Sequence, residues 1–327
     1  MREDTSTGRD TAKPVLDEAT ESFVRHRELL FSLAYNLLGT VSDTEDVLQE
    51  TWLSWASAPR RDIVNPRAYL VRIAVNEAVS RLRRVQRSRE RYVGPWLPEP
   101  LATEVATAEE RALRAESVSL ALLVVLETLT PLERVVFVLR EAFGYAHAEI
   151  AAILGRSPSA VRQLARRARA HVEARRPRFD PDPAARRAAT ERFLAATVNG
   201  DIERLMNVLA PDVRLWSDGG GRLRAALRVI EGREKVVRLL TALRANPPGT
   251  LDIPRLDIRY VEINGGPAAA VFSGATLYAA LAVDLTAPTP RTKRGEGPVA
   301  AIYGMVNPDK LTPLARSLAH GRGEAPG

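Results

Sequence analysis

The sequence predicts a multidomain protein with two all-α modules followed by an α+β domain that contains a curved antiparallel sheet. Helix caps followed by apolar residues at spacings of three and four recur through the first 176 residues. Proline-rich segments at residues 94–101 and 177–183 interrupt this pattern. Beyond them, helical patterns give way to a series of strand-like runs, which is typical of the α+β class.

These signals predict the organisation of the whole chain. Residues 1–19 are polar and lack periodicity, so we expect a disordered N-terminal segment. The chain then divides into a first helical module, a linker, a second helical module, a second linker, the α+β domain and a tail: residues 20–92, 93–115, 116–176, 177–183, 184–320 and 321–327.

Charge is distributed unevenly along the chain. The net charge is +7 and the isoelectric point is near 10, which favours an anionic partner. Residues 17–50 hold eight acids and two arginines, whereas residues 60–91 hold ten arginines and three acids. This segregation predicts two contact surfaces of opposite sign.

The composition also excludes several classes of protein. Without cysteine there are no disulfides or thiolate zinc sites, and the four histidines are scattered along the chain. The first residues lack the apolar core of a signal peptide, and no apolar run approaches the length of a membrane span. We therefore expect a soluble, cytoplasmic protein without a metal or an organic cofactor.

The first module begins with two predicted helices. A helix from Glu21 is expected to stop at Gly39, and Ser42 with Glu45 matches a capping box for the next helix. The apolar positions of the first helix are Leu30, Leu33, Ala34 and Leu37.

The second helix has two faces of different character. Asp46, Gln49 and Glu50 share a polar, acidic face. Trp52 and Trp55 lie on another face in register with apolar neighbours, so the simplest interpretation is that both tryptophans belong to the core.

The third helix is expected to start at Asn65 and Pro66 and becomes strongly basic toward its end. Aromatic residues, including Tyr69, Tyr92 and Trp96, accompany the charges. Cations that hold a backbone beside rings that stack bases are typical of surfaces for single-stranded nucleic acid. The basic residues are Arg81, Arg83, Arg84, Arg87, Arg89 and Arg91.

The linker that follows contains three prolines within residues 94–101, so it forms neither a helix nor a regular strand. A flexible spacer would ordinarily lack Trp96, Leu97 and Leu101. We therefore expect this segment to dock in a groove rather than serve as an idle spacer.

The second module contains a predicted helix-turn-helix between Tyr145 and Val172. Gly155 suits the end of its first helix, and Ser157 with Pro158 suits the start of its second. The buried face of the second helix is Val161, Leu164, Ala165, Ala168 and Val172, and its outer face is Ser159, Arg162, Gln163, Arg166, Arg167 and Arg169.

The outer face of that helix favours DNA binding. Arginine can form two hydrogen bonds with a guanine edge or bind phosphate, and glutamine can form two with adenine. From Arg156 to Arg178 there are eight arginines and one acid, Glu173. The alternative is a solvated basic helix of an all-α enzyme.

The α+β domain is predicted from three helices and six strand-like runs. The helices are residues 184–199, 202–209 and 233–244. The strand-like runs are residues 213–216, 223–229, 256–263, 268–278, 281–285 and 299–306, with a basic loop, 288–297, before the last.

Taken together, these motifs resemble those of bacterial extracytoplasmic-function (ECF) sigma factors of the sigma-70 superfamily that carry a fused C-terminal SnoaL-like (NTF2-like) domain. The residues that carry the resemblance are D-T-E-D-V-L-Q-E-T-W from Asp43, N-P-R-A-Y-L-V-R-I from Asn65, W-L-P-E-P-L from Trp96, the helix-turn-helix, D-G-G-G-R from Asp218 and N-P-D-K-L from Asn307. They span residues 21–311 in the order found in that family.

The resemblance implies roles for the two modules: region 2, residues 20–92, and region 4, residues 116–176. The acidic face of Asp46, Gln49 and Glu50 would contact core RNA polymerase. The third helix would melt and read the promoter −10 element, and the helix from Ser157 the −35 element. The implied −10 residues are Arg72, Asn76, Arg81, Arg83 and Arg84, and the −35 residues are Ser159, Arg162, Gln163, Arg166 and Arg167.

For the third domain the resemblance implies control of sigma activity through contact with the sigma modules, although ligand sensing and catalysis by Asp218 or Asp309 are alternatives. Arg222 stands where the family motif ends in lysine, and Ser80 where an acid is common. The implied regulatory residues are Trp96, Leu97, Pro98, Glu99, Pro100, Asp218, Gly219, Gly220, Gly221, Arg222, Asn307, Pro308, Asp309 and Lys310.

The function predicted is therefore promoter recognition and transcription initiation with core polymerase, with the C-terminal domain as an intramolecular regulator. A small-molecule ligand of that domain is an open option at this stage. Two alternatives stay open at this stage: a helix-turn-helix regulator that never joins polymerase, and a SnoaL-type enzyme with a DNA-binding appendage.

Overall fold

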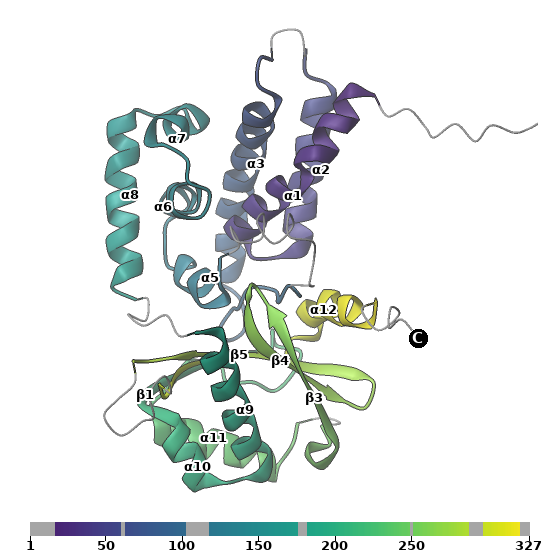
Figure 1. The fold of residues 1–327 in the computed structure, drawn as a ribbon, viewed down its shortest axis with the longest axis vertical. Coiled ribbons are helices and arrows are strands. Elements are labelled where there is room, and N and C mark those ends of the chain that lie inside the picture. The colour runs from purple at the N-terminus through teal and green to yellow at the C-terminus, as the bar shows by residue number, and fades with distance from the viewer. Residues whose placement is uncertain are drawn as a thin grey trace, which may run out of the picture.

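The computed structural model describes residues 17–59, 63–102, 118–175, 182–248, 251–287 and 297–320. Helical modules form one half of the molecule, and the α+β domain forms the other (Figure 1). Residues 1–16 of the segment predicted to be disordered and residues 288–296 of the predicted basic loop lie outside the described residues.

Three helices form the first module: α1 (Glu18–Leu38), α2 (Val41–Ala56) and α3 (Pro66–Arg89). Helix α1 begins three residues before the predicted Glu21, because Asp17 caps it by accepting a hydrogen bond from the Thr20 amide. Gly39 ends it in the left-handed conformation at φ 74°, as predicted. Asn65 caps α3, also as predicted.

The predicted capping box of Ser42 and Glu45 is wrong. Helix α2 starts at Val41 after Thr40, whose side chain bonds to the Asp43 carboxylate instead of capping the helix. The Val41 amide donates a 2.7 Å hydrogen bond to Oε2 of Glu99, which comes from the linker. A carboxylate distant in the sequence thus takes the place of the local cap, and it suits the positive end of the helix dipole.

The second module contains α5 (Leu120–Leu126), α6 (Pro131–Phe137), a π-helical turn η2 (Val138–Ala142), α7 (His147–Leu154) and α8 (Pro158–Glu173). The Thr130–Glu133 capping box of α6 forms in full. Gly155 ends α7 at φ 60°, and Ser157 caps α8, so the predicted helix-turn-helix is confirmed.

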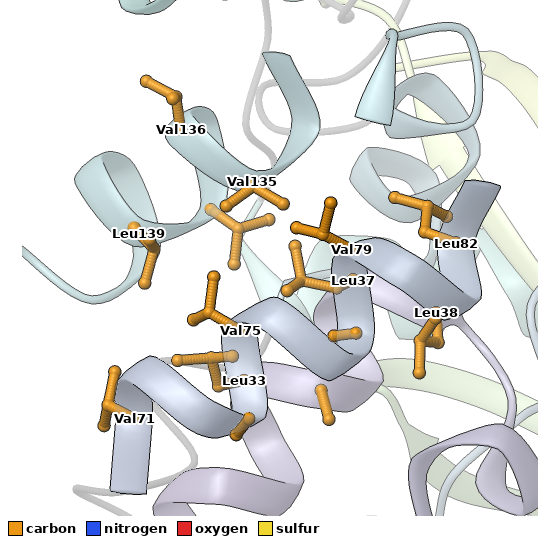
Figure 2. Packing of buried hydrophobic residues seen from close by; sticks show 14 of the residues in the cluster. Leu33, Leu37, Leu38, Val71, Val75, Val79, Leu82, Val135, Val136 and Leu139 are labelled. Atoms are coloured by element: carbon orange, nitrogen blue, oxygen red, sulfur yellow. The ribbon is translucent and has the colours of Figure 1, made fainter. Parts of the chain in front are cut away.

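The two helical modules share one hydrophobic core. Figure 2 shows Val71, Val75 and Val79 of α3 facing Val135 of α6 and Leu139 of the following turn. All five side chains are buried. Because burying a valine or leucine side chain contributes about 1.5–3 kcal/mol, this packing holds region 2 and region 4 together in the free protein.

The third domain combines helices α9 (Pro183–Asn199), α10 (Ile202–Val208) and α11 (Arg233–Ala245) with a six-stranded sheet, and α12 (Pro308–His320) follows the last strand. The strands are β1 (Leu209–Asp218), β2 (Ile230–Glu231), β3 (Leu256–Ile263), β4 (Gly266–Ser273), β5 (Thr276–Leu285) and β6 (Val299–Met305).

The strand order is β2-β1-β6-β5-β4-β3. The sheet is mixed, which corrects the prediction of an antiparallel sheet, because β1 and β6 run parallel. A parallel pair requires a long crossover, and the chain between these strands includes α11 and four other strands.

Two strand predictions differ from the structure. Residues 223–229 form no regular strand and continue the glycine turn after Asp218. The run 268–278 is split into β4 and β5 by a turn at positive-φ Gly274. A glycine turn reverses the chain here, although the apolar pattern alone predicts one continuous strand.

The two faces of the sheet are covered differently. Helices α9, α10 and α11 pack on one face. The opposite face packs against Leu97 of the linker, residues of α5 and residues of α12. The linker and region 4 thereby complete the core of the third domain, which places the junction of all three parts at this face.

Candidate promoter-binding faces and interdomain site

Helix α8 presents the face predicted to read the −35 element. All five predicted residues are exposed, while the five apolar residues of its other face are buried in the module core. Arg167 contacts Glu133 of α6 at 3.2 Å. Within the described residues, Arg162, Gln163 and Arg166 have no hydrogen-bonded or ionic partner, so their donors point to solvent. This arrangement provides guanidinium donors and a side-chain amide on one helix face.

Helix α3 presents a second exposed basic face. Arg72, Asn76, Arg83 and Arg84 are all exposed. Arg72 lies over the Tyr69 ring, 5.3 Å from its centroid, which provides a cation and an aromatic surface at the same place.

Arg81 differs from the other predicted −10 residues, because it is paired within the protein. Its Nε bonds to Asp43 at 2.6 Å, and its Nη2 bonds to Asp46. Burial lowers the pKa of Arg81, but the two carboxylates outweigh that effect and the net shift is upward. Asp46, Gln49 and Glu50 are exposed on α2, so the acidic face adjoins the basic face through this pair.

The buried site of the third domain is centred on Asp218, whose exposed fraction is 0%. Its Oδ1 accepts hydrogen bonds from the Tyr92 hydroxyl at 2.6 Å and the Gly220 amide at 3.1 Å. Its Oδ2 accepts from the Leu97 amide at 2.8 Å and Lys310 Nζ at 2.8 Å. We call Asp218, Lys310, Tyr92 and Asn307 the Asp218 cluster.

Lys310 completes the contact with the linker. Its ammonium donates to the Leu97 carbonyl at 2.5 Å and lies 4.2 Å from the centroid of the Trp96 ring. Burial lowers the pKa of Lys310 to about 8, although the charge of Asp218 acts in the opposite direction. The Leu97 peptide is therefore held from both sides, at its N–H by Asp218 and at its carbonyl by Lys310.

The N-P-D-K-L motif places Asn307 against the glycine turn. The Asn307 amide donates to the Tyr92 hydroxyl at 2.9 Å, and its side-chain oxygen accepts from the Asp309 amide at 3.1 Å. Gly220 has φ 55°, and a Cβ there would collide with the Asn307 side chain. The D-G-G-G-R turn therefore needs glycine for both conformation and space.

Three predicted regulatory side chains lie outside the buried cluster. Arg222 and Asp309 form an ion pair at 3.1 Å, with 65% and 62% of their side chains exposed. Pro308 is also exposed. These residues border the cluster without contacting the linker peptide, and an exposed pair of this kind contributes little to stability.

The linker also binds region 2. Besides capping α2, Glu99 bonds through its amide to the Gly39 carbonyl at 2.8 Å, and its own carbonyl accepts from the Tyr35 hydroxyl at 2.6 Å. Burial raises the pKa of the Glu99 carboxyl. A Cβ at Gly39 would lie 2.8 Å from Trp96, so the end of α1 fits closely against the linker. The prediction that the linker docks is supported in its details by these contacts.

Asn264 was not anticipated from the sequence, yet it joins the third domain to region 2 and to the linker. It lies in the turn between β3 and β4 at φ 52°. Its amide donates to the Tyr35 hydroxyl at 2.7 Å, and its backbone N–H donates to the Leu101 carbonyl at 2.9 Å. The Asn-Gly pair at residues 264–265 signals a hairpin turn, but nothing local indicates partners so far away in the chain.

A buried ionic group between the two helical modules was also missed. Glu127, at the end of α5, pairs with Arg89 of α3 and with Arg134 of α6. Arg134 is fully buried and reaches the Asn36 carbonyl, and Arg89 lies over the Trp96 ring at 3.4 Å. Burial lowers the pKa of Arg89. Arg89 therefore lies in the interior, although its position in the sequence predicts that it belongs to the basic surface.

Within the described part of the chain, no group of three or more histidine, aspartate or glutamate side chains is arranged to hold a metal ion. In the same residues, no helix has the length and apolar character needed to cross a membrane.

Comparisons with known proteins agree with this geometry. The family model for sigma-70 region 2 matches residues 23–88, and that for sigma-70 region 4 matches residues 119–172. The helical half is therefore of the sigma-70 class. ECF RNA polymerase sigma factor SigJ of Mycobacterium tuberculosis is 39% identical over 291 residues, which cover 88% of this chain and 91% of that protein. The probable ECF sigma factor SigI of the same species is 30% identical, covering 93% and 99%.

The crystal structure of M. tuberculosis SigJ superposes with a TM-score of 0.67 at 34% identity, covering 90% of this chain and 98% of that chain. The chain belongs to the extracytoplasmic-function RNA polymerase sigma factors and carries the predicted SnoaL-like α+β domain at its C-terminal end. It is a promoter-recognising transcription initiation factor.

Proposed function

We propose that this sigma factor is regulated in cis: its C-terminal domain holds regions 2 and 4 in a closed arrangement, and initiation requires that arrangement to open. The observation that carries the proposal is the Leu97 peptide, which Asp218 and Lys310 hold from both sides. The third domain thereby binds the segment that joins the two DNA-reading modules.

The closed arrangement does not suit a promoter. Positions −10 and −35 are about 25 base pairs apart, which corresponds to about 85 Å at roughly 3.4 Å per base pair. Helix α3 packs directly on α6 and α7. A helix of 16 residues such as α8 is only about 24 Å long at about 1.5 Å per residue. Regions 2 and 4 must therefore separate before both elements are read together.

We assign the surfaces as follows. The exposed face of α8 reads the closed duplex at the −35 element, because its arginines and glutamine suit base edges in the major groove. The exposed basic face of α3 binds the −10 element, where Tyr69 and Arg72 offer a stacking surface and a cation. Gln49 and Glu50 of α2, together with Asp46, contact core polymerase, so we propose that the protein acts in the cytoplasm.

Asp218 acts in this proposal as a structural group and not as a catalytic acid or base. Both of its oxygens already accept hydrogen bonds, and its side chain is fully buried against the linker. A reactive carboxylate needs an open position for substrate. Turnover of a substrate that is lost on Asp218→Asn would support the enzymatic alternative.

The direct test is transcription from a cognate promoter by core polymerase and the full chain. Asp218→Asn is expected to increase initiation at a limiting sigma concentration, because it weakens closure without touching α3 or α8. Glu50→Lys is expected to abolish binding to core polymerase while leaving the fold intact. Equal initiation by wild type and Asp218→Asn would contradict regulation by this site.

A further inference from the structure

The third domain contains an apolar cavity of about 300 Å³, separate from the Asp218 cluster. It lies beneath the sheet face that α9 and α11 cover, and aromatic and aliphatic side chains such as Phe193, Leu240 and Ile302 line it. Its volume is at the lower end of the range for small-molecule sites, about 300–1,000 Å³. The closely packed interior of a domain of this size has no structural need for such a space.

The polar groups of the lining define the chemistry of an occupant. Arg224 is the one fully charged lining residue within the described chain; it is exposed, and no described carboxylate pairs with it. Tyr278, Asn246 and Thr197 supply neutral hydrogen-bonding groups. A guanidinium beside an otherwise apolar space suits a molecule with an apolar body and one carboxylate.

The wall of the cavity is continuous with the regulatory site. Ser217 and Val306 line the cavity, and the next residues in the chain, Asp218 and Asn307, belong to the Asp218 cluster. The Val306 amide also donates to the Asp218 carbonyl at 2.9 Å. Displacement of either strand end in the cavity therefore acts directly on groups that hold the linker.

The loop after the glycine turn has one side in the cavity and the other on the linker. Ala225 and Ala226 line the cavity. The Ala226 carbonyl would lie 3.4 Å from a Cβ at Gly94, and Val93 would lie 3.4 Å from a Cβ at Gly221. The docked linker thus contacts this loop in the position in which the loop lines the cavity.

We propose that the cavity binds a small apolar carboxylic acid, with its carboxylate at Arg224, and that binding and linker docking favour each other. The ligand class is inferred from the cavity alone, whereas the coupling between ligand binding and linker docking rests on the cis regulation proposed above. Since coupling between two sites is reciprocal, a ligand that binds the docked form more tightly also stabilises docking. The ligand is then a repressing signal for initiation.

The binding experiment uses isothermal titration of the full chain with decanoate and 1-naphthoate, and with 1-decanol as the uncharged match for decanoate. We expect decanoate to bind more tightly than 1-decanol, and Arg224→Gln to remove that preference, a loss of about tenfold in affinity. Ala279→Leu, which fills the cavity, is expected to abolish binding. If circular dichroism shows that Ala279→Leu is misfolded, Ala225→Val is used as the cavity-filling variant instead.

Each result of the titration bears on the proposal. An absence of binding by all three probes overturns the site, and unchanged binding to both cavity-filling variants places the probe elsewhere and also overturns it. Equal affinity for acid and alcohol overturns the assignment to Arg224.

The coupling is tested with Asp218→Asn, which leaves the cavity lining unchanged. We expect this variant to bind the tightest probe severalfold more weakly than wild type, and the probe to reduce initiation by wild type but not by the variant. Equal affinity of the two proteins overturns the coupling while leaving the binding site intact. If the probe binds both equally and Asp218→Asn still increases initiation, cis regulation stands without a ligand.

Discussion

The outer face of α8 and the Asp218 cluster both consist of charged and polar groups, but they differ in how they are built. The α8 face comes from one continuous stretch of sequence, and its arginines lie in solvent. The Asp218 cluster joins residues more than 100 positions apart, and its charged groups, Asp218 and Lys310, are buried. A surface for an external partner can be exposed and locally encoded, whereas an internal restraint derives its strength from burial and exact pairing.

The largest expected effect comes from the buried carboxylate. Asp218→Asn removes the counter-charge of Lys310 in a buried site, and loss of one partner of such a pair costs about 3–5 kcal/mol. We expect most of this cost to appear as undocking of the linker. Hydrogen exchange at the amides of Leu97 and Glu99 measures it directly.

A matched control lies beside the cluster. Asp309→Asn removes the exposed pair with Arg222, which is expected to cost about 1 kcal/mol or less. If Asp309→Asn increases exchange at Leu97 as much as Asp218→Asn does, burial is not the source of the restraint.

Glu127 provides a second test of the buried groups. Glu127→Gln leaves Arg89 and Arg134 without their shared carboxylate, and we expect a loss of about 3–5 kcal/mol in the free energy of unfolding. Chemical denaturation followed by circular dichroism measures the loss. The control is Glu141→Gln, because Arg169, the partner of Glu141, is about half exposed. The free energy of unfolding of this variant should lie within about 1 kcal/mol of the wild-type value.

The exposed face of α8 should behave in the opposite way. Arg162→Ala and Gln163→Ala are expected to leave unfolding unchanged but to cost about 1–3 kcal/mol in binding to the cognate promoter, with relaxed sequence preference. Binding of the polymerase holoenzyme to cognate and scrambled −35 sequences measures both. An equal loss on the two sequences would indicate phosphate contact instead of base reading.

The smallest expected effect is that of pH. Docking holds the pKa of Lys310 at about 8, below its ordinary value of 10.5, so the undocked form binds more protons between these values. Docking then releases a proton, and rising pH favours the closed arrangement through this window. From about pH 7 to about pH 9 the closed-to-open ratio should rise at most about tenfold. Lys310→Met should remove the dependence; a fall in the ratio with pH would contradict the assignment.

The difference between the two regions also explains what the sequence could predict. The caps at Asn65 and Ser157 and the apolar register of α8 depend on neighbours within a few residues, and all of them form. The Ser42 cap failed because Glu99, 58 residues away in the chain, binds the Val41 amide instead.

Long-range partners left no comparable signal. The motif W-L-P-E-P-L indicated docking through its apolar residues, and the family resemblance pointed to D-G-G-G-R and N-P-D-K-L. Neither the apolar residues of the linker nor the resemblance indicated Tyr92 or Asn264. Tyr92 binds Asp218 across 126 residues of chain, and Asn264 binds Leu101 across 163. A tyrosine or asparagine within a loop has many possible partners, and only the packed structure selects among them.

The most direct measurement is the distance between α3 and α8 in the full chain. The absence of native cysteine allows spin labels at Ser80→Cys and Ala170→Cys, both on exposed positions. A single short distance is predicted for the free protein, and a population tens of ångströms longer for Asp218→Asn and for the complex with core polymerase. An identical distance distribution in all three samples would contradict the closed arrangement as the regulated state.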